Sequence, residues 1–526
     1  MTLQRLPERP DLEQLKRQAK DLLRIARRGD AATLHRFREL PAFAAYSDEE
    51  LTRASLALHD AQSVIAREHG FPSWKALHAR VEELTLDREA AAAAFVEAAT
   101  GGRSDRAARL LARHPEIGNT DFHAALVLGR ADVATRALAA APHLATAAGG
   151  PRGWPPLLYV CHTSSAFCPA DSADGLVAVA RTLLAAGADP NTRYPWPHHG
   201  VHRPALWGAA LVTRRPSLVA LLLEAGADPD DGVTLPLAAC SRETGLLDLL
   251  VTHGADPNQP WATDGSPALY AIMAWADESA GIRRLLEHGA DPNRACDSNG
   301  ETAMHAVARR WDANLAAFFA EHGAHLERPR HDGRTPYAVA ALSGNRAVAE
   351  WLAGRGVSTD IAEVDRLVGA CNRGDLAEVE GMLAARPSLR DEISDEHYSA
   401  WFQAADRGDA LALEAMLACG FGIDRKDEEM GKTALHAAAM GGWPDAVRVL
   451  LTRGASVSVH DDEFDAQPLV WAAEGARGGH ARSSRDHTEV ATLLVEAGSS
   501  FEWRSPTDQP AEAVRTILAD WRRTLA

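Results

Sequence analysis

The segment Leu249-Leu-Val-Thr-His-Gly254-Ala-Asp-Pro-Asn258 contains the pattern that decides the fold of this chain. Two leucines at the end of a helix can pack against a neighbouring helix. Glycine follows at the position where a left-handed backbone ends a helix with little strain. Proline excludes helical geometry from the residue before it, so Asp-Pro-Asn predicts a turn. The segment therefore predicts a helix, a glycine C-cap and a tight turn in succession.

The same pattern recurs along the chain. Three more full copies occupy residues 183–191, 222–230 and 285–293. Weaker copies centre on five further glycines: Gly323, Gly356, Gly420, Gly454 and Gly498. Successive glycines are 28 to 44 residues apart, except for one interval of 64 in which Arg386 occupies the glycine position of a degenerate copy. A period of about 33 residues predicts a solenoid of stacked helix–turn–helix units.

A second motif opens the first helix of three units. It reads Gly300-Glu-Thr-Ala-Met-His305 in one unit and Gly431-Lys-Thr-Ala-Leu-His436 in another, and Gly333-Arg-Thr-Pro336 is a third version. Threonine is a favoured N-cap, proline suits a helix start, and small alanines let helices approach closely. Because both motifs recur in order, the chain closely resembles the ankyrin repeat family. The resemblance implies an all-α solenoid with β-turn fingers, in which His305 and His436 stabilise turns.

The repeats suggest three parts. We expect a small helical module at 1–86, an ankyrin solenoid of about twelve units at 87–500, and a C-terminal capping segment at 501–526. In the first part, apolar spacing predicts a helix from Asp11, a second from Asp48 to His69, and a third that begins after Ser73. This part resembles a short module often found at the front of bacterial ankyrin proteins.

Composition limits the class of protein. The formal charge is −17, and all of the excess acid lies beyond residue 85, so nucleic acid is a poor partner. There is no run of 18 apolar residues and no apolar leader, and the six cysteines are scattered. Only five of the basic residues are lysines, which is typical of a GC-rich bacterial genome. We therefore expect a cytoplasmic bacterial protein, without a membrane span or a cofactor, and monomeric.

In an ankyrin solenoid the turns and first helices line the concave face, which directs attention to the aromatic and acidic residues there. Interface anchors are enriched in Trp, Tyr and Arg, and acidic turns steer basic partners. The predicted partner-binding residues are Trp196, Trp207, Trp261, Tyr270, Asp461, Asp462 and Trp471. Trp503 also falls in a predicted turn.

The sequence contains no Gly-x-Ser-x-Gly, His-Glu-x-x-His, Cys-x-x-Cys or Gly-x-Gly-x-x-Gly motif, so we expect no enzyme. The leading hypothesis is a protein-binding scaffold or inhibitor with a basic partner. The alternative is an enzyme or a small-molecule or metal binder that uses the inserted segments, 163–175 and 475–487, or the turn containing His198, His199 and His202, whose imidazoles are of a kind that binds zinc. A third hypothesis is self-assembly.

Overall fold

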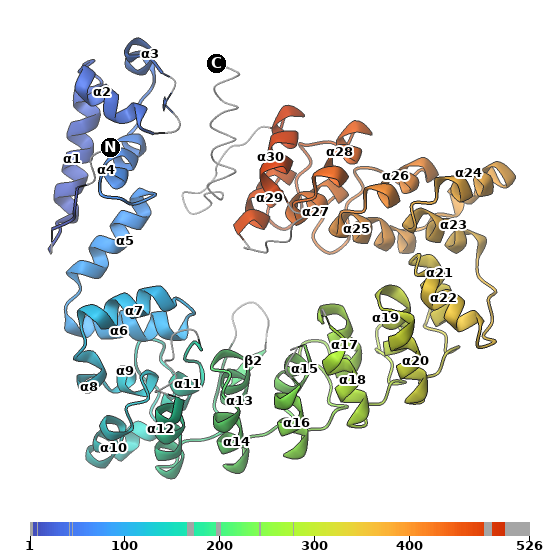
Figure 1. The fold of residues 1–526 in the computed structure, drawn as a ribbon, viewed down its shortest axis with the longest axis horizontal. Helices are drawn as coiled ribbons and strands as arrows, with labels where there is room; N and C mark the ends of the chain where they lie inside the picture. The colour runs from blue at the N-terminus through green and yellow to red at the C-terminus, as the bar shows by residue number, and fades with distance from the viewer. Residues whose placement is uncertain are drawn as a thin grey trace.

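The computed structural model describes residues 4–7, 9–40, 43–44, 46–165, 173–195, 201–240, 244–276, 278–477 and 486–499. Helices stack side by side into an arc whose last helices return toward the first (Figure 1). The named strands of the described residues are β1 (Arg193–Pro195) and β2 (His202–Pro204), which pair antiparallel. The predicted all-α solenoid with an N-terminal helical module is therefore confirmed.

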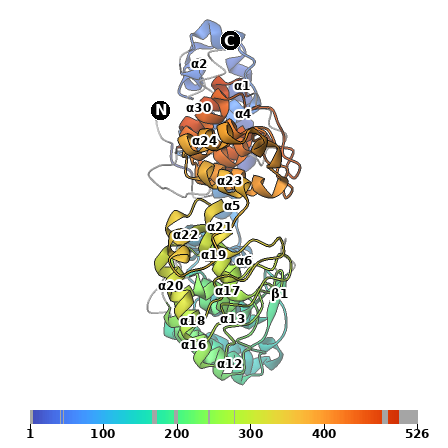
Figure 2. The same cartoon turned by 90° about the vertical axis from the view of Figure 1, so that its right-hand side faces the viewer.

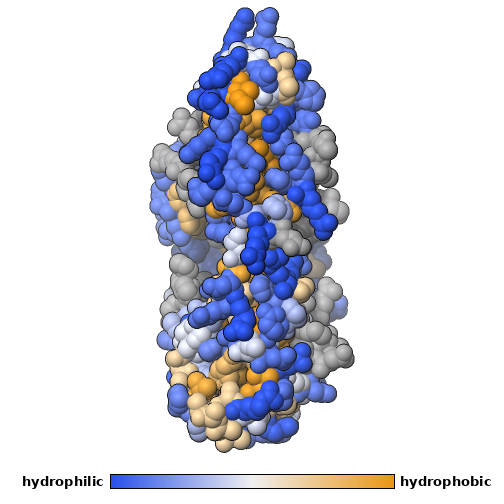
Figure 3. All heavy atoms as spheres, turned by 90° about the vertical axis from the view of Figure 1, so that its left-hand side faces the viewer, coloured by the Kyte–Doolittle hydropathy of each residue, from blue (hydrophilic) through white to orange (hydrophobic). Residues whose placement is uncertain are grey.

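The N-terminal module contains five helices: α1 (Leu12–Ala26), α2 (Ala31–Arg38), α3 (Asp48–Arg53), α4 (Leu58–Glu68) and α5 (Trp74–Thr85). They enclose a core of their own, in which Phe37, Leu51 and Leu77 are fully buried. On α5 the buried Glu83 binds Arg106 and Arg109 of the first helix pair of the array, at 3.3 and 3.0 Å. Figure 3 shows that the side of the molecule that carries this module is covered mainly by hydrophilic residues.

One predicted helix of this module is wrong. The run from Asp48 to His69 is two helices, α3 and α4, because the backbone is extended at Ala54 and Ala57. The carboxylate of Asp60 accepts the backbone N–H of Ala57 at 2.8 Å and so starts a new helix there. Leu56, in the break, is buried in the module core. Helix α2 was not predicted at all. The predicted helix starts at Asp11 and after Ser73 are confirmed, and both residues are N-caps.

Twelve helix pairs follow among the described residues. They are α6 (Arg88–Thr100) with α7 (Ser104–Arg113), α9 (Phe122–Val127) with α10 (Ala131–Ala140), α11 (Pro156–Cys161) with α12 (Ala173–Ala185), α13 (Ala205–Trp207) with α14 (Pro216–Glu224), α15 (Thr234–Ala239) with α16 (Gly245–Thr252), α17 (Ala268–Trp275) with α18 (Ala280–Glu287), α19 (Ala303–Arg310) with α20 (Ala313–Glu321), α21 (Pro336–Leu342) with α22 (Arg346–Ala353), α23 (Glu363–Asn372) with α24 (Leu376–Ala385), α25 (Tyr398–Arg407) with α26 (Ala410–Cys419), α27 (Ala434–Gly441) with α28 (Pro444–Thr452), and α29 (Pro468–Arg477) with α30 (His487–Glu496).

Short segments interrupt this regular alternation. A single turn, α8 (Ile117–Thr120), precedes α9, and a π-helical turn, η4 (Gly208–Val212), continues α13. The 3-10 turns are η2 (Pro142–Ala145), η5 (Pro387–Glu392) and η6 (Asp395–His397). The predicted helix at Ala511–Leu525 and the whole segment 501–526 lie outside the described residues.

The repeated glycine plays its predicted role. Gly187, Gly226, Gly254 and Gly289 have φ values of 95°, 93°, 96° and 89°, so each adopts the left-handed conformation. The paired leucines before them reach the core: one leucine of each pair is fully buried. His305 and His436 also behave as the resemblance implies. Each accepts the backbone N–H of the helix-capping threonine at Nδ1, and its Nε2 faces a carbonyl of the next turn.

The apolar core of the array is divided in two. One cluster runs from Ala92 to Leu352 and the other from Leu342 to Val495. The division falls at the pair α21–α22, whose residues belong to the first cluster except for Leu342 at the end of α21, and the direction of the array also changes here (Figure 1). We call this place the joint.

Replacing the C-cap glycine is expected to destabilise the array. Gly254→Ala places a side chain at φ 96°, where nothing lies within 4 Å, so backbone strain alone should cost about 1–2 kcal/mol of unfolding free energy. Gly381→Ala is the control, since Gly381 is an exposed residue inside α24. This control should stabilise the protein by about 0.5–1 kcal/mol. Urea unfolding followed by circular dichroism measures the free energy of unfolding of both variants. Equal changes of the same sign would contradict the role of Gly254 as a left-handed C-cap.

Candidate functional site

The inner side of the arc carries the first helix of most pairs, and the outer side carries the second (Figure 1). The turns that lead into the first helices project along one edge, where Figure 2 shows β1. The sequence placed all of its candidate residues on these two surfaces. The contacts of each residue decide which of them are available to a partner.

Asp461 organises the last of these turns. It is only 3% exposed, and its carboxylate accepts the backbone N–H groups of Glu463, Phe464 and Ala466 at 3.0, 2.6 and 3.1 Å. It also accepts the indole N–H of Trp471 at 2.9 Å. Burial alone would raise the pKa of Asp461, but these hydrogen bonds outweigh it and lower the pKa. Asp461 and Trp471, both predicted to touch a partner, therefore hold the turn in shape.

Phe464 stands out from this turn. Its side chain is 62% exposed, although it is a large apolar group, and its ring meets the edge of Trp471 at 6.3 Å. The next residue, Asp465, adopts a left-handed φ of 50°, which is unusual for a side chain other than glycine. The prediction from sequence missed Phe464. The sequence signal that could have identified Phe464 is an aromatic residue between two carboxylates in a predicted turn.

The preceding turn adds more carboxylates to this place. Asp462 donates its backbone N–H to the carbonyl of Met430 at 2.9 Å, and Lys426 binds its carboxylate at 2.6 Å. Glu428 and Glu429 are exposed beside them. We define the acidic fingertip surface as Glu428, Glu429, Asp462, Glu463 and Phe464.

Tyr270 is engaged within the array. Its hydroxyl donates to the carboxylate of Glu301 at 2.7 Å, and Glu301 is 1% exposed. Arg309 and Arg330 also bind Glu301. Burial alone would raise the pKa of Glu301, but these two arginines and Tyr270 lower it. Tyr270 thus belongs to a buried charge cluster that joins successive units.

A second charge cluster spans the joint. The guanidinium of Arg334 binds both carboxylate oxygens of Asp365 at 2.9 Å, and it also binds Asp332 at 2.6 Å and Glu396 at 2.7 Å. His397 faces the same Asp365 oxygen that Arg334 Nη2 binds, at 2.9 Å. Burial alone would raise the pKa of Asp365, but the bonds from His397 and Arg334 lower it to about 2. Charged groups therefore connect the two apolar cores.

Ser394, His397 and Asp365 are hydrogen-bonded in series, in the manner of a hydrolytic triad, with Ser394 Oγ 3.0 Å from His397 Nδ1. The same serine or threonine to histidine contact occurs at Thr302–His305 and Thr433–His436. The contact between Ser394 and His397 is therefore the helix cap of the repeat. Asp365 belongs to the charge cluster at the joint.

Trp207 packs between units. It is 9% exposed, its ring lies parallel to that of His162 at 5.8 Å, and the guanidinium of Arg203 covers it at 4.1 Å. Trp261 is half-buried in its turn, and His202 is exposed on β2. Trp196, His198, His199 and Trp503 lie outside the described residues. Within the described part of the chain, no three histidine, cysteine or acidic side chains are grouped to hold a metal ion.

Comparison with known families matches ankyrin repeats (three copies) at residues 270–363 and 401–503. A search of curated proteins finds no match. The chain therefore contains ankyrin repeats in its C-terminal region. Ankyrin repeats are generally protein–protein interaction modules, and domains built from them are typically non-catalytic. No helix of the described residues combines the length and apolar character needed to cross a membrane.

Loss of the guanidinium at the joint is expected to be strongly destabilising. Arg334→Met leaves the buried Asp365 without its bidentate partner and with His397 alone beside it, which should lower the free energy of unfolding by about 3–5 kcal/mol at pH 7. Because the folded pKa of Asp365 is about 2 and its ordinary value 3.8, the wild type loses this stabilisation as the pH falls through that interval. The difference in free energy of unfolding between wild type and Arg334→Met should therefore become smaller as the pH falls.

Urea unfolding at a series of pH values measures this difference. Arg346→Met is the control, since Arg346 pairs with Glu350 on an exposed helix face and its loss should leave the midpoint unchanged. Similar destabilisation by both variants would show that the joint does not depend on Arg334.

Proposed function

We propose that this chain is a non-catalytic scaffold or inhibitor that binds a protein with a basic surface, in the cytoplasm of a bacterial cell. The partner lies along the inner face and the turns of the array. The observation that carries the proposal is the exposed ring of Phe464 within the acidic fingertip surface. The array uses no cofactor for this role.

An exposed phenylalanine that is held in place is suited to binding. Asp461 fixes the turn through three hydrogen bonds to backbone N–H groups and one to the Trp471 indole, so little further freedom is lost when a partner covers the ring. Burial of an aromatic side chain supplies a large apolar contribution, and such side chains anchor many interfaces. Asp461 and Trp471 enter this proposal as supports of Phe464.

The surrounding carboxylates define the kind of partner. Glu428, Glu429, Asp462 and Glu463 are exposed around Phe464, and Lys426 offsets only part of their charge. A partner with arginine or lysine near an apolar side chain would match both features. Long-range attraction between opposite charges raises the association rate and is screened by salt. Trp261 and Tyr270 would extend the contact along the array.

The division of the chain is part of the proposal. Residues 87–500 form the binding array, residues 1–86 cover its first helix pair, and residues 501–526 cap its last unit. Terminal units of a solenoid expose an apolar face, so covering segments at both ends stabilise the array.

A pull-down from lysate of the source organism tests this function. The variant Phe464→Ala with Glu463→Lys removes the exposed ring and reverses one charge. We expect it to retain at least about tenfold less of the specific partner than wild type, since loss of an anchor residue costs 2 kcal/mol or more. Added salt should weaken capture by wild type.

The control is Leu411→Ala with Glu380→Lys. Leu411 is also 62% exposed and Glu380 is exposed, but both lie on second helices, α26 and α24, at the outer side. The control should capture the partner as well as wild type. Equal capture by all three proteins, or equal loss in both variants, would contradict a site at the acidic fingertip surface.

A further inference from the structure

The charge of the array changes sign along its length. Residues 88–215 contain 13 arginines and 9 acidic residues, whereas residues 216–526 contain 28 basic and 49 acidic residues. The first helix pairs are therefore cationic, in contrast to the rest of an acidic chain. A partner that binds the acidic fingertip surface would be repelled by them.

Aromatic rings gather in this cationic part. Trp154 stacks on Tyr194 with ring centroids 4.4 Å apart, and both rings meet His162, at 5.4 and 5.1 Å. Trp207 also stacks on His162, with ring centroids 5.8 Å apart. These rings connect two successive units, since Trp154 precedes α11 and Tyr194 lies on β1. Six cation–π contacts are described along the chain, and two belong to this cluster.

Two arginines form the outer layer of the cluster. Arg152 lies over Trp154 at 4.9 Å and Arg203 lies over Trp207 at 4.1 Å, and both are half-buried while the indoles beneath are 9% exposed. Thr100 Oγ1 and the carbonyl of Glu97 hold Arg152 in place, at 2.7 and 3.1 Å. Stacking uses the face of each guanidinium, so the two arginines fix the indoles beneath them and place positive charge at the surface of the cluster.

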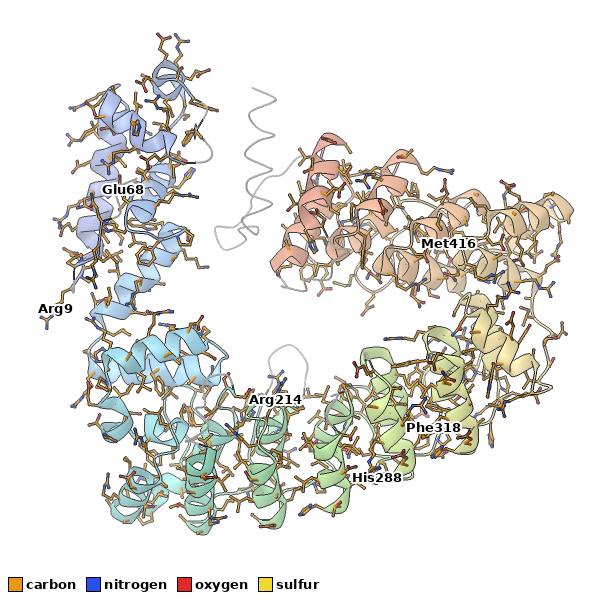
Figure 4. All side chains as sticks on the ribbon, viewed as in Figure 1. Arg9, Glu68, Arg214, His288, Phe318 and Met416 are labelled. Atoms are coloured by element: carbon orange, nitrogen blue, oxygen red, sulfur yellow. The ribbon has the colours of Figure 1, made fainter. Side chains whose placement is uncertain are left out.

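The backbone is irregular at the same place. The helix that begins at Ala205 continues as the π-helical turn η4, and Arg214 follows with a left-handed φ of 53°. Gly208 is required, because a Cβ there would overlap the ring of His162. Strained backbone and π-helical turns are concentrated at functional sites. Arg214 is exposed on the inner side of the array (Figure 4).

His162 is the buried centre of this cluster. It is 2% exposed, its Nδ1 faces the carbonyl of Leu158 at 3.1 Å, and its Nε2 has no hydrogen-bond partner among the described residues. Burial, with Arg203 and Arg152 nearby, lowers the pKa of His162 to about 3, so the ring is neutral. An unsatisfied buried nitrogen is uncommon in a core that serves packing alone.

We infer that Arg152, Trp154, Tyr194, Arg203 and Trp207, with the exposed Arg193 and Arg214, form a second binding surface, which takes an acidic segment of a protein partner. Carboxylates of the segment bind the exposed Arg193 and Arg214, and its apolar groups lie against the half-buried Tyr194, which stacks on Trp154. A nucleic acid is a poorer match, because the remaining acidic array repels a long phosphate backbone. The chain thereby has two surfaces of opposite charge on one array, and it can hold two different partners.

The test measures fluorescence anisotropy of a fluorescein-labelled 15-residue peptide of glutamate, aspartate and tyrosine with the full chain at low salt. The variant is Arg193→Glu, Arg203→Glu and Arg214→Glu. The matched control is Arg130→Glu, Arg136→Glu and Arg181→Glu, which makes the same charge change at exposed positions of α10, its N-cap and α12. Circular dichroism confirms that all three proteins are folded.

We expect the acidic peptide to bind wild type and the control with affinities within about twofold of one another. It should bind the variant with glutamate at 193, 203 and 214, called the inner variant, at least about tenfold more weakly. A lysine-rich peptide of equal length should not lose affinity for the inner variant. Absence of binding to wild type, or equal weakening by both variants, would overturn the inference. Equal competition by a single-stranded oligonucleotide of the same charge would overturn the assignment to a protein segment.

Discussion

Each helix pair of this protein can bury its apolar surface only against the pairs on either side, and every other feature depends on this constraint. The left-handed glycine after most second helices, such as Gly187 and Gly226, turns the chain into the next unit so that the contact is renewed. The capping threonines and the histidines His305 and His436 fix the next first helix relative to the following turn. Stability is thus distributed along the array, and the inner face and turns are left for recognition.

The departures from the repeat are where distinct properties arise. At the joint the apolar core is interrupted, and Arg334 with Asp365 connects its two parts through charge. Near the C-terminal end Asp461 builds a turn that exposes Phe464 among carboxylates, and near the beginning a π-helical turn accompanies arginines stacked on indoles. A regular unit requires none of these arrangements. The proposed binding surfaces rest on them, because a repeated scaffold acquires specificity where its residues differ from unit to unit.

The fold was predictable from sequence because its determinants are local: glycine, proline and threonine act on neighbouring residues, and their period gives the stacking. The two helices at 48–69 were not separated, since their boundary depends on the Asp60 carboxylate and on Leu56 reaching a distant core. The site was predicted less well. Asp461, Tyr270 and Trp207 were recognised as unusual, but their partners, Trp471, Glu301 and Arg203, are set by packing that spacing does not reveal. The exposure of Phe464 likewise follows from hydrogen bonds within a turn.

The central claim is that the acidic fingertip surface contacts a basic protein in the cell. It is tested most directly by placing the photo-crosslinking residue p-benzoylphenylalanine at position 464 in the source organism, and at position 411 as the comparison. The account predicts one dominant protein crosslinked to position 464, through a basic segment of that protein. The yield of this adduct should fall at high salt in lysate, and the same protein should not be crosslinked to position 411. The same adducts at both positions, or no adduct at 464 while the protein is folded, would contradict it.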